Sequence, residues 1–138
     1  METVTVSRTI SAPESTLSDA ITDVEPFMRA AGFDEVVVEG DEIRITNRVG
    51  IAEIQLTLGI IDLPDAVLAY EQCDGLFESM RTVYRLEDAG EVGVRVEAET
   101  NFALDVALVG ELLDATVVSR QRRRELDAQF DYLDSLAA

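Results

Sequence analysis

The chain has 138 residues, 47% of them hydrophobic, and its 28 acidic residues outnumber the 11 basic ones to give a formal net charge of −17. This length and apolar content are typical of one folded domain, residues 1–138, and exclude an extended disordered chain. Because the sequence contains no His and no Lys, it excludes imidazole bases, Schiff-base lysines, phosphate-loop lysines and the usual transition-metal sites.

The charge pattern indicates the environment and the partners of the protein. All of the basic residues are arginine, and an acidic surface with arginine in place of lysine is typical of proteins that work in concentrated salt, where screening removes most of the self-repulsion. Such a surface is a poor partner for DNA. No apolar run approaches the roughly 20 residues that span a bilayer, and the N-terminus lacks the features of a signal peptide. We therefore expect a cytoplasmic, salt-adapted protein without cofactor or metal ion.

The first elements are a strand and two short helices. Residues 3–10 alternate between apolar and polar side chains, which predicts a strand. Ser11 and Glu14 have the spacing of a capping box, so a helix is expected to begin there. Pro26 disfavours helical geometry at the residue before it and predicts a stop or bend at that point. A second short helical turn then ends at Gly32.

Residues 33–104 predict six more strands joined by short turns. A two-residue turn at Gly40 and Asp41 and a tight turn at Val49 and Gly50 keep the apolar side chains on one face. A turn through Asp88–Gly90 predicts a third hairpin. In that hairpin Tyr84 would lie opposite Val94, Thr82 opposite Val96, Met80 opposite Ala98 and Arg81 opposite Glu97.

The strand at about residues 66–72 has two possible registers with the strand that follows it. A two-residue turn at Asp74 and Gly75 would place Glu71 opposite Glu78. A three-residue turn would instead place Tyr70 opposite Met80. The second register is preferred because it avoids a pair of like charges across the two strands.

From Asp105 onward the apolar spacing changes to that of one long helix, with Asp105 as its N-cap. The apolar stripe includes Val109, Leu112, Leu113 and Thr116, and resumes as Leu126, Phe130, Leu133 and Ala137. Residues 119–125, between these two parts, contain no apolar side chain. Projecting the stripe through this gap places Ser119 and one of Arg122 or Arg123 toward the sheet.

The order of these elements resembles that of a known superfamily. Ile10-Ser-Ala-Pro13, followed by Leu17, Ile21 and Asp23, is similar to the opening of START-like (SRPBCC) proteins. The resemblance implies an α+β helix-grip fold, in which a seven-stranded curved antiparallel sheet wraps around a long C-terminal helix, with two short helices between strands 1 and 2. The superfamily includes polyketide cyclases and lipid-transfer domains, and its members hold apolar ligands between sheet and helix. It has no shared catalytic motif, so the resemblance assigns no catalytic residue.

The face of the sheet that would point toward this helix combines apolar and polar side chains, as ligand pockets do. The candidate ligand-binding residues are Asn47, Ile54, Leu56, Glu78, Met80, Thr82, Tyr84, Val96 and Phe102 on the strands, and Ser119 and Arg123 on the helix. If Glu78 is buried beside Arg123, the two would form an ion pair, because an unpaired buried charge is costly.

Three functions fit this face. We favour non-covalent binding or transport of an apolar or amphipathic small molecule, without catalysis. The enzymatic alternative is cyclase- or dehydratase-like turnover of a polyketide-type substrate, with Glu78 and Tyr84 transferring protons. The third is a protein-interaction module with a filled core and an exposed apolar patch.

The dense arginine cluster at Arg120, Arg122, Arg123 and Arg124 also has three interpretations. The arginines could pair with surface carboxylates and interact favourably with the C-terminal end of the helix dipole. One of them could instead hold the anionic head-group of a ligand. The third interpretation is a contact with a protein or RNA partner.

Overall fold

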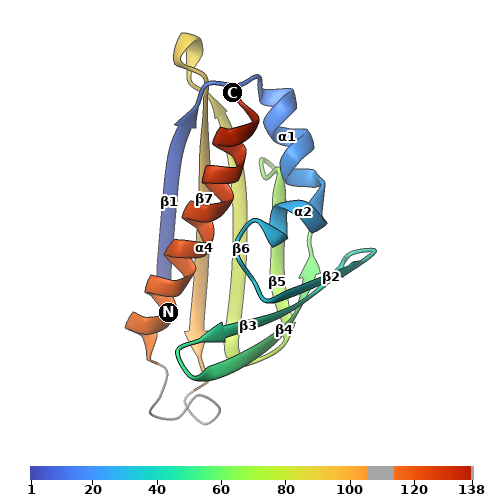
Figure 1. Ribbon diagram of the computed structural model, residues 1–138, viewed down its shortest axis with the longest axis vertical. Helices are drawn as coiled ribbons and strands as arrows, with labels where there is room; N and C mark the ends of the chain where they lie inside the picture. The colour runs from blue at the N-terminus through green and yellow to red at the C-terminus, as the bar shows by residue number, and fades with distance from the viewer. Residues whose placement is uncertain (106–113, 138) are drawn as a thin grey trace.

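The computed structural model describes residues 1–105 and 114–137, and its elements follow the predicted order (Figure 1). They are β1 (Glu2–Ile10), α1 (Glu14–Thr22), α2 (Val24–Arg29), β2 (Glu35–Glu39), β3 (Glu42–Val49), β4 (Ala52–Ile60), β5 (Leu68–Asp74), β6 (Phe77–Asp88), a 3-10 turn (Gly90–Val92), β7 (Val94–Leu104) and α4 (Ala115–Leu136). The strands form one seven-stranded antiparallel sheet in the order β1-β7-β6-β5-β4-β3-β2. The predicted α+β helix-grip architecture is therefore confirmed.

Helices α1, α2 and α4 lie on one face of the sheet, and the core fills the space between them and the strands (Figure 1). Helix α4 packs on β1 and β7, while α2 packs on β2. Strands β2, β3 and β4 run obliquely to β1 and β7, so the sheet curves around α4 (Figure 1). The largest buried side chains on the helices are Leu17, Ile21, Phe27, Met28, Leu126 and Phe130. This arrangement encloses the inner face of the sheet along one side of α4.

Helix α1 begins after Pro13, which is its N-cap, and no side chain caps it. The predicted capping box from Ser11 is therefore wrong, because Pro13 holds an extended backbone (φ −61°, ψ 146°) that delays the first turn. The break between the two helices lies at Asp23, where ψ is 78°. This is earlier than predicted. Pro26 lies in the first turn of α2, where a missing N–H removes no helical hydrogen bond.

The first two hairpins keep the predicted faces. Val36 lies opposite Ile45 and Val38 opposite Ile43, as predicted. In the second hairpin Val49 lies opposite Ala52, so the two-residue loop is formed by Gly50 and Ile51 instead of Val49 and Gly50. The resulting register change spans an even number of residues, so Ile54 and Leu58 remain on the inner face with Ile43 and Ile45.

The hairpin of β6 and β7 is four residues out of the predicted register. Tyr84 lies opposite Ala98, Thr82 opposite Thr100, Met80 opposite Phe102 and Arg81 opposite Asn101. The reason is that β6 continues to Asp88 and the connection contains a 3-10 turn at Gly90–Val92. The Asp88 carboxylate accepts a hydrogen bond from the backbone N–H of Gly90 at 2.8 Å. Because the shift is even, Met80, Thr82 and Tyr84 keep their predicted inward face.

Both registers considered for β5 are wrong. Tyr70 lies opposite Thr82, and Glu71 lies opposite Arg81, with which it forms an ion pair at 3.0 Å. The turn between β5 and β6 is longer than predicted because the side-chain amide of Gln72 pairs with the backbone of Phe77. It donates to the Phe77 carbonyl at 2.9 Å and accepts from the Phe77 N–H at 3.0 Å.

The long C-terminal helix begins later than predicted. Asp114 is its N-cap, and the Asp114 side chain accepts a hydrogen bond from the backbone N–H of Val117 at 3.0 Å. Since Asp114 is extended (φ −119°, ψ 173°), one uninterrupted helix from Asp105 is wrong. Residues 106–113, which include Val109, Leu112 and Leu113 of the predicted stripe, lie outside the described residues. Leu126, Phe130 and Leu133 are buried as predicted, whereas Ala137 is exposed.

Candidate functional site

A small cavity lies between α4 and the inner face of the sheet. Its volume is about 50 Å³, which is space for only a few water molecules. The apolar part of its wall is Phe33, Ile45, Ile54, Leu58, Phe77, Met80, Phe102 and Val118, and the polar part is Asn47, Tyr70, Thr100, Gln121, Arg122 and Glu125. The polar residues come from α4 and from several different strands, so they converge only in the folded chain.

Arg122 is the centre of the polar part. It is 8% exposed, and its guanidinium bonds to four side chains. Nε donates to Thr100 Oγ1 at 2.9 Å, Nη1 donates to Glu125 Oε1 at 3.0 Å, and Nη2 donates to the Tyr70 hydroxyl and to Thr82 Oγ1, the latter at 3.2 Å. This arrangement satisfies almost all of the N–H donors of a guanidinium.

Glu125 is the counter-ion of Arg122 and is 6% exposed. The two residues are three positions apart on α4, which places them on one face of the helix. The other carboxylate oxygen, Oε2, accepts from Asn47 Nδ2 at 2.7 Å and from Gln121 Nε2 at 3.2 Å. Throughout the described part of the chain, every buried polar side-chain atom has a hydrogen-bond partner. The ion pair is therefore buried but fully bonded.

A second set of hydrogen bonds extends from this pair along α4. The Tyr70 and Tyr84 hydroxyls lie 3.3 Å apart, and the Tyr84 hydroxyl donates to Gln129 Oε1 at 2.6 Å. Gln129 Nε2 donates in turn to the backbone carbonyl of Phe27 in α2 at 3.1 Å. The polar network therefore joins the cavity wall to the second helix through the middle of the core.

The electrostatics of this network follow from its burial. Burial raises the pKa of Tyr84 well above 10, and Tyr70 acts in the same direction, while Arg122 opposes the shift. For Arg122 burial disfavours the charge, but Tyr70, Tyr84 and Glu125 outweigh this effect and hold its pKa above its ordinary value. Near neutral pH, Tyr84 is therefore an uncharged hydroxyl and Arg122 is a cation.

The structure brings together part of the predicted site. Asn47, Ile54, Met80 and Phe102 line the cavity. Thr82, Tyr84 and Val96 are buried in the core and are not part of the cavity wall, and Thr82 and Tyr84 belong to the polar network. Leu56 is half-buried and packs against Ile54. The inward faces of these strand residues follow from the alternation of side chains, and their role in ligand binding stays a prediction.

Three predicted residues lie elsewhere. Glu78 is exposed, at the irregular start of β6 where the pairing with β7 shifts. Arg123 is exposed and donates to the backbone carbonyl of Thr5 at 3.2 Å. The conditional Glu78–Arg123 ion pair therefore does not form. Ser119 is half-buried and outside the cavity wall. Arg122 takes the inward position instead of Arg123. It lies four residues before the buried Leu126, and this spacing on one helix face could have been recognised in the sequence.

Four polar residues of the wall were missed by the sequence analysis: Tyr70, Thr100, Gln121 and Glu125. The i, i+3 spacing of Arg122 and Glu125 was available as a signal once Arg122 was assigned to the inner face. Tyr70 and Thr100 lie on the inner face by side-chain alternation, since Tyr70 is opposite Thr82 and Thr100 lies between Ala98 and Phe102, so this alternation was the signal that could have found them.

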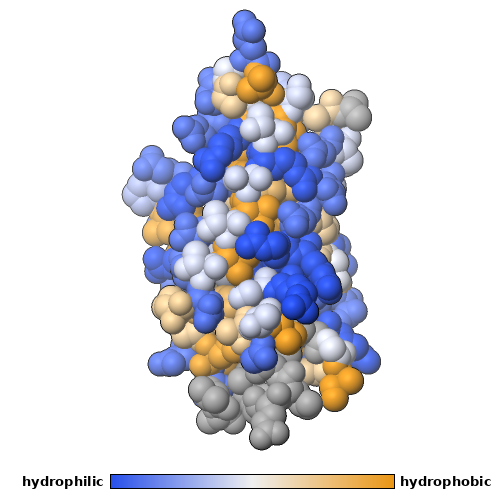
Figure 2. Space-filling view, turned by 90° about the vertical axis from the view of Figure 1, so that its left-hand side faces the viewer, coloured by the Kyte–Doolittle hydropathy of each residue, from blue (hydrophilic) through white to orange (hydrophobic). Residues whose placement is uncertain are grey.

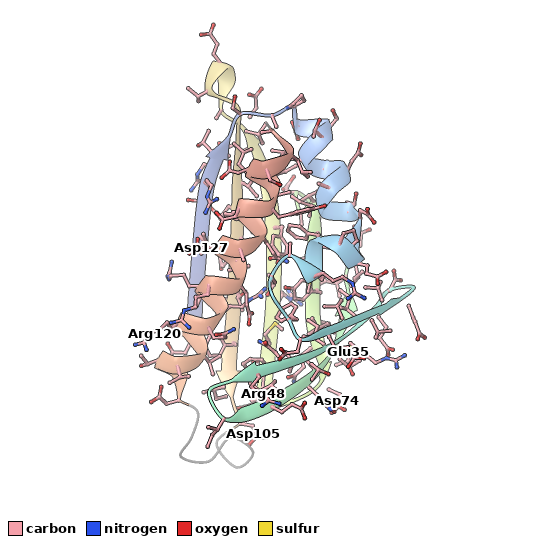
Figure 3. All side chains as sticks on the ribbon, in the orientation of Figure 1. Glu35, Arg48, Asp74, Asp105, Arg120 and Asp127 are labelled. Atoms are coloured by element: carbon pink, nitrogen blue, oxygen red, sulfur yellow. The ribbon has the colours of Figure 1, made fainter. Side chains whose placement is uncertain are left out.

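The remaining arginines of the helix cluster face away from this site. Arg120, Arg123 and Arg124 are exposed, and Figure 3 shows Arg120 on the side of α4 away from α2. Within residues 1–105 and 114–137, no carboxylate lies within 4.0 Å of these three guanidiniums, whereas Arg122 is paired. Pairing with a carboxylate therefore accounts for one member of the cluster.

A larger hollow of about 370 Å³ lies elsewhere on the surface, between the end of α1 and the connection of β4 to β5. Its wall includes Thr22, Asp62 and Leu63. The face in Figure 2 is mostly hydrophilic, with apolar side chains in narrow bands. No helix in the described ranges is long and apolar enough to cross a membrane.

The comparisons with known proteins identify a fold. No family model and no curated protein matches the sequence. Many solved structures do match the fold. A START superfamily protein from Mycobacterium smegmatis has a TM-score of 0.75 at 9% identity, over 98% of this chain and 96% of that one. The Zhui aromatase/cyclase from Streptomyces sp. R1128 also has a TM-score of 0.75, at 18% identity, over 95% of this chain and 92% of that one.

A protein of Thermus thermophilus is similar to the same degree, with a TM-score of 0.75 and 17% identity over 99% of this chain and 97% of that one. These structures share the order and packing of elements along nearly the whole chain. The chain therefore has the START-like helix-grip fold, as the resemblance of its N-terminal residues implied. At these identities the similarity establishes the fold, and the function has to be argued from the site.

Proposed function

We propose that this protein binds an apolar or amphipathic small molecule non-covalently between α4 and the sheet. The observation that carries the proposal is the cavity wall, in which apolar side chains surround a few convergent polar groups. Such a wall is typical of small-molecule sites, where the apolar part holds the body of the ligand and the polar groups fix its orientation. Arg122, Glu125 and Tyr70 are the central polar groups in this proposal.

The size of the cavity sets a condition on binding. Typical ligand sites have volumes of roughly 300–1,000 Å³, whereas this cavity has about 50 Å³. A ligand larger than a few waters can enter only if the wall moves. Met80 is unbranched and adaptable, and Phe33 and Phe77 are only half-buried, so these side chains are the ones we expect to be displaced.

The two alternatives are less well supported. A cyclase-like mechanism with Glu78 and Tyr84 requires both near one ligand atom, but Glu78 is exposed and Tyr84 is not part of the cavity wall. An interaction module with a filled core is consistent with the small cavity. However, the large exposed apolar residues in the described part of the chain, Met1, Ile51, Val92 and Leu136, come from separate elements and loops.

Native mass spectrometry on protein purified in high salt tests the proposal, with the denatured mass as reference. We expect a discrete added mass that is lost on denaturation. Val118→Phe should abolish it, because Val118 lines the cavity and a phenyl ring would fill the space. The matched control is Val92→Phe, at an exposed position in the β6–β7 connection, which should retain the added mass. An added mass that survives Val118→Phe would contradict the proposed location.

A further inference from the structure

We infer that the ligand is uncharged and presents a hydroxyl group, or a similar hydrogen-bond donor, to Glu125. This inference rests on the proposed function and narrows it, because it excludes carboxylates, phosphates and ammonium ions as the polar end of the ligand. It follows from which bonding positions of the buried ion pair are already used.

The cation of the site is largely occupied by protein side chains and cannot hold an anion through two N–H groups. The guanidinium of Arg122 already donates to Thr100, Glu125, Tyr70 and Thr82. Anionic head-groups are recognised by arginine through two parallel N–H groups that point at the ligand. The bonds to protein side chains use four of the five N–H groups, and one N–H of Nη1 has no hydrogen-bond partner among the described residues. A carboxylate or phosphate could therefore meet Arg122 through one N–H, but it could bind through two parallel N–H groups only by displacing bonds that stabilise the core.

The anion of the site retains acceptor capacity. A carboxylate has roughly four acceptor positions, and Glu125 uses three of them, for Arg122, Asn47 and Gln121. Among the residues that the structure describes, Oε1 accepts only the bond from Arg122, while Oε2 accepts the two amide bonds. Since Glu125 is part of the cavity wall, the remaining position on Oε1 matches a donor such as a hydroxyl of the ligand.

Charge balance gives the same result. Arg122 and Glu125 neutralise each other within a buried wall, so a charged ligand would enter an apolar site without a counter-ion. An anion would also lie beside the Glu125 carboxylate, and an ammonium ion would lie beside the Arg122 guanidinium. The net charge of −17 further disfavours the approach of anions.

A matched series of three probes tests the inference on the full chain at pH 7. The probes are 4-propylphenol, 4-propylbenzoate and 4-propylbenzylammonium, which share one apolar body and differ in the charge of the polar end. Isothermal titration calorimetry measures the dissociation constant of each. We expect the phenol to bind at least about tenfold more tightly than either charged probe, because like charges and unpaired buried charges are strongly penalised.

The Glu125→Gln variant tests the role of the carboxylate. It leaves Arg122 without its counter-ion, so the affinity of the benzoate relative to the phenol should rise by about tenfold. Asp127→Asn is the control, because it removes the same charge from α4 at a half-exposed position whose nearest cation, Arg8, is 3.9 Å away. In this variant the affinity of the benzoate relative to the phenol should not change. Circular dichroism checks that both variants are folded, and the three probes on the unmodified chain decide the question if Glu125→Gln is not.

The outcomes separate the inference from the proposed function. Preference for the phenol, with a shift toward the benzoate only in Glu125→Gln, supports both. Equal or tighter binding of either charged probe to the unmodified chain overturns the inference but leaves small-molecule binding intact. No binding of any probe counts against the proposed function itself.

Discussion

At the residue scale, the buried pair of Arg122 and Glu125 links the stability of the core to the chemistry of the cavity. Removing charges from water is costly, and the cost is offset only when each charge is paired and its remaining positions are bonded. The two residues meet this condition, since their partners come from β3, β5, β6 and β7 as well as from α4. The pair therefore holds the helix in one position relative to the sheet.

Arg122→Met should lower the free energy of unfolding by about 3–5 kcal/mol, because it leaves the Glu125 carboxylate buried without a counter-ion. The double variant Arg122→Met/Glu125→Met should recover most of this loss, since it replaces both charges with apolar side chains. Arg44→Met is the control: Arg44 forms exposed ion pairs with Glu39 and Glu42, so its loss should leave the free energy of unfolding nearly unchanged. Urea unfolding measures all three, and equal costs for Arg122→Met and Arg44→Met would contradict the account.

Tyr84 predicts a pH dependence of stability. Burial raises the pKa of Tyr84 well above 10 in the folded chain, so the unfolded chain loses this proton first as the pH rises. The contribution of Tyr84 is therefore complete below about pH 10 and is lost above it, at up to about 1.4 kcal/mol per pH unit. In Tyr84→Phe this contribution to the slope of the unfolding free energy against pH should disappear, while the contributions of other groups remain. Urea unfolding between pH 8 and pH 11 compares the two chains, and identical slopes would exclude the effect.

At the scale of elements, the connection between β6 and β7 shows why glycine is required at one position. Gly93 has a φ of 123°, and a Cβ atom there would lie 2.1 Å from the carbonyl oxygen of Ile10 in β1. Gly90, in the same connection, has a φ of 74° but no atom within 4 Å of the corresponding position. A side chain at Gly90 would therefore introduce backbone strain alone, whereas a side chain at Gly93 would add a steric clash.

Gly93→Ala should destabilise the chain by about 3 kcal/mol or more, because it combines backbone strain with displacement of β1. Gly90→Ala should cost only about 1–2 kcal/mol, since it carries the backbone strain alone. Thermal unfolding followed by circular dichroism compares the two variants. A similar cost for both would show that β1 and the connection are not packed as described.

The element scale also shows how far the sequence determines the fold. The order of the elements and the inward face of each strand were predictable, because both depend on apolar periodicity and short turns. The registers of β5 and β7 were not, because they depend on contacts that no local rule describes. The side chain of Gln72 lengthens one turn, and a 3-10 turn at Gly90–Val92 lengthens the other.

The site was predictable to the same extent. Asn47, Met80 and Phe102 follow from strand alternation and do line the cavity. The choice between Arg122 and Arg123 required the rotation of α4, which depends on where the helix begins, and Asp114 lies nine residues after the predicted N-cap at Asp105. Predicting the ion pair of Arg122 with Glu125 required both the rotation of α4 and the burial of the two side chains, which only the three-dimensional structure provides.

At the scale of the whole molecule, the net charge of −17 sets the conditions for folding. Six arginines of the described residues form ion pairs with carboxylates, but the 28 acidic residues of the chain far outnumber its 11 arginines, so most of the negative charge is not neutralised. In dilute buffer the resulting self-repulsion destabilises the compact state. Adaptation to concentrated salt remains a prediction from this balance.

The melting temperature should therefore rise steadily as NaCl is increased from about 0.1 M to 1 M, since the screening length falls from about 10 Å to about 3 Å over this range. Sucrose at equal osmolality is the control, because it changes burial without screening charge. Differential scanning fluorimetry measures both series. A melting temperature that is independent of NaCl, or that rises equally in sucrose, would argue against a role for charge repulsion.

The central claim is that the cavity between α4 and the sheet is the binding site, and mapping a bound probe onto the backbone tests it most directly. The measurement is a titration of isotopically labelled protein with 4-propylphenol, followed by the chemical shifts of assigned backbone amides. We expect the largest changes at residues of the cavity wall such as Met80, Phe102, Arg122 and Glu125. Changes centred instead on Asp62 and Leu63, in the larger surface hollow, would contradict the claim.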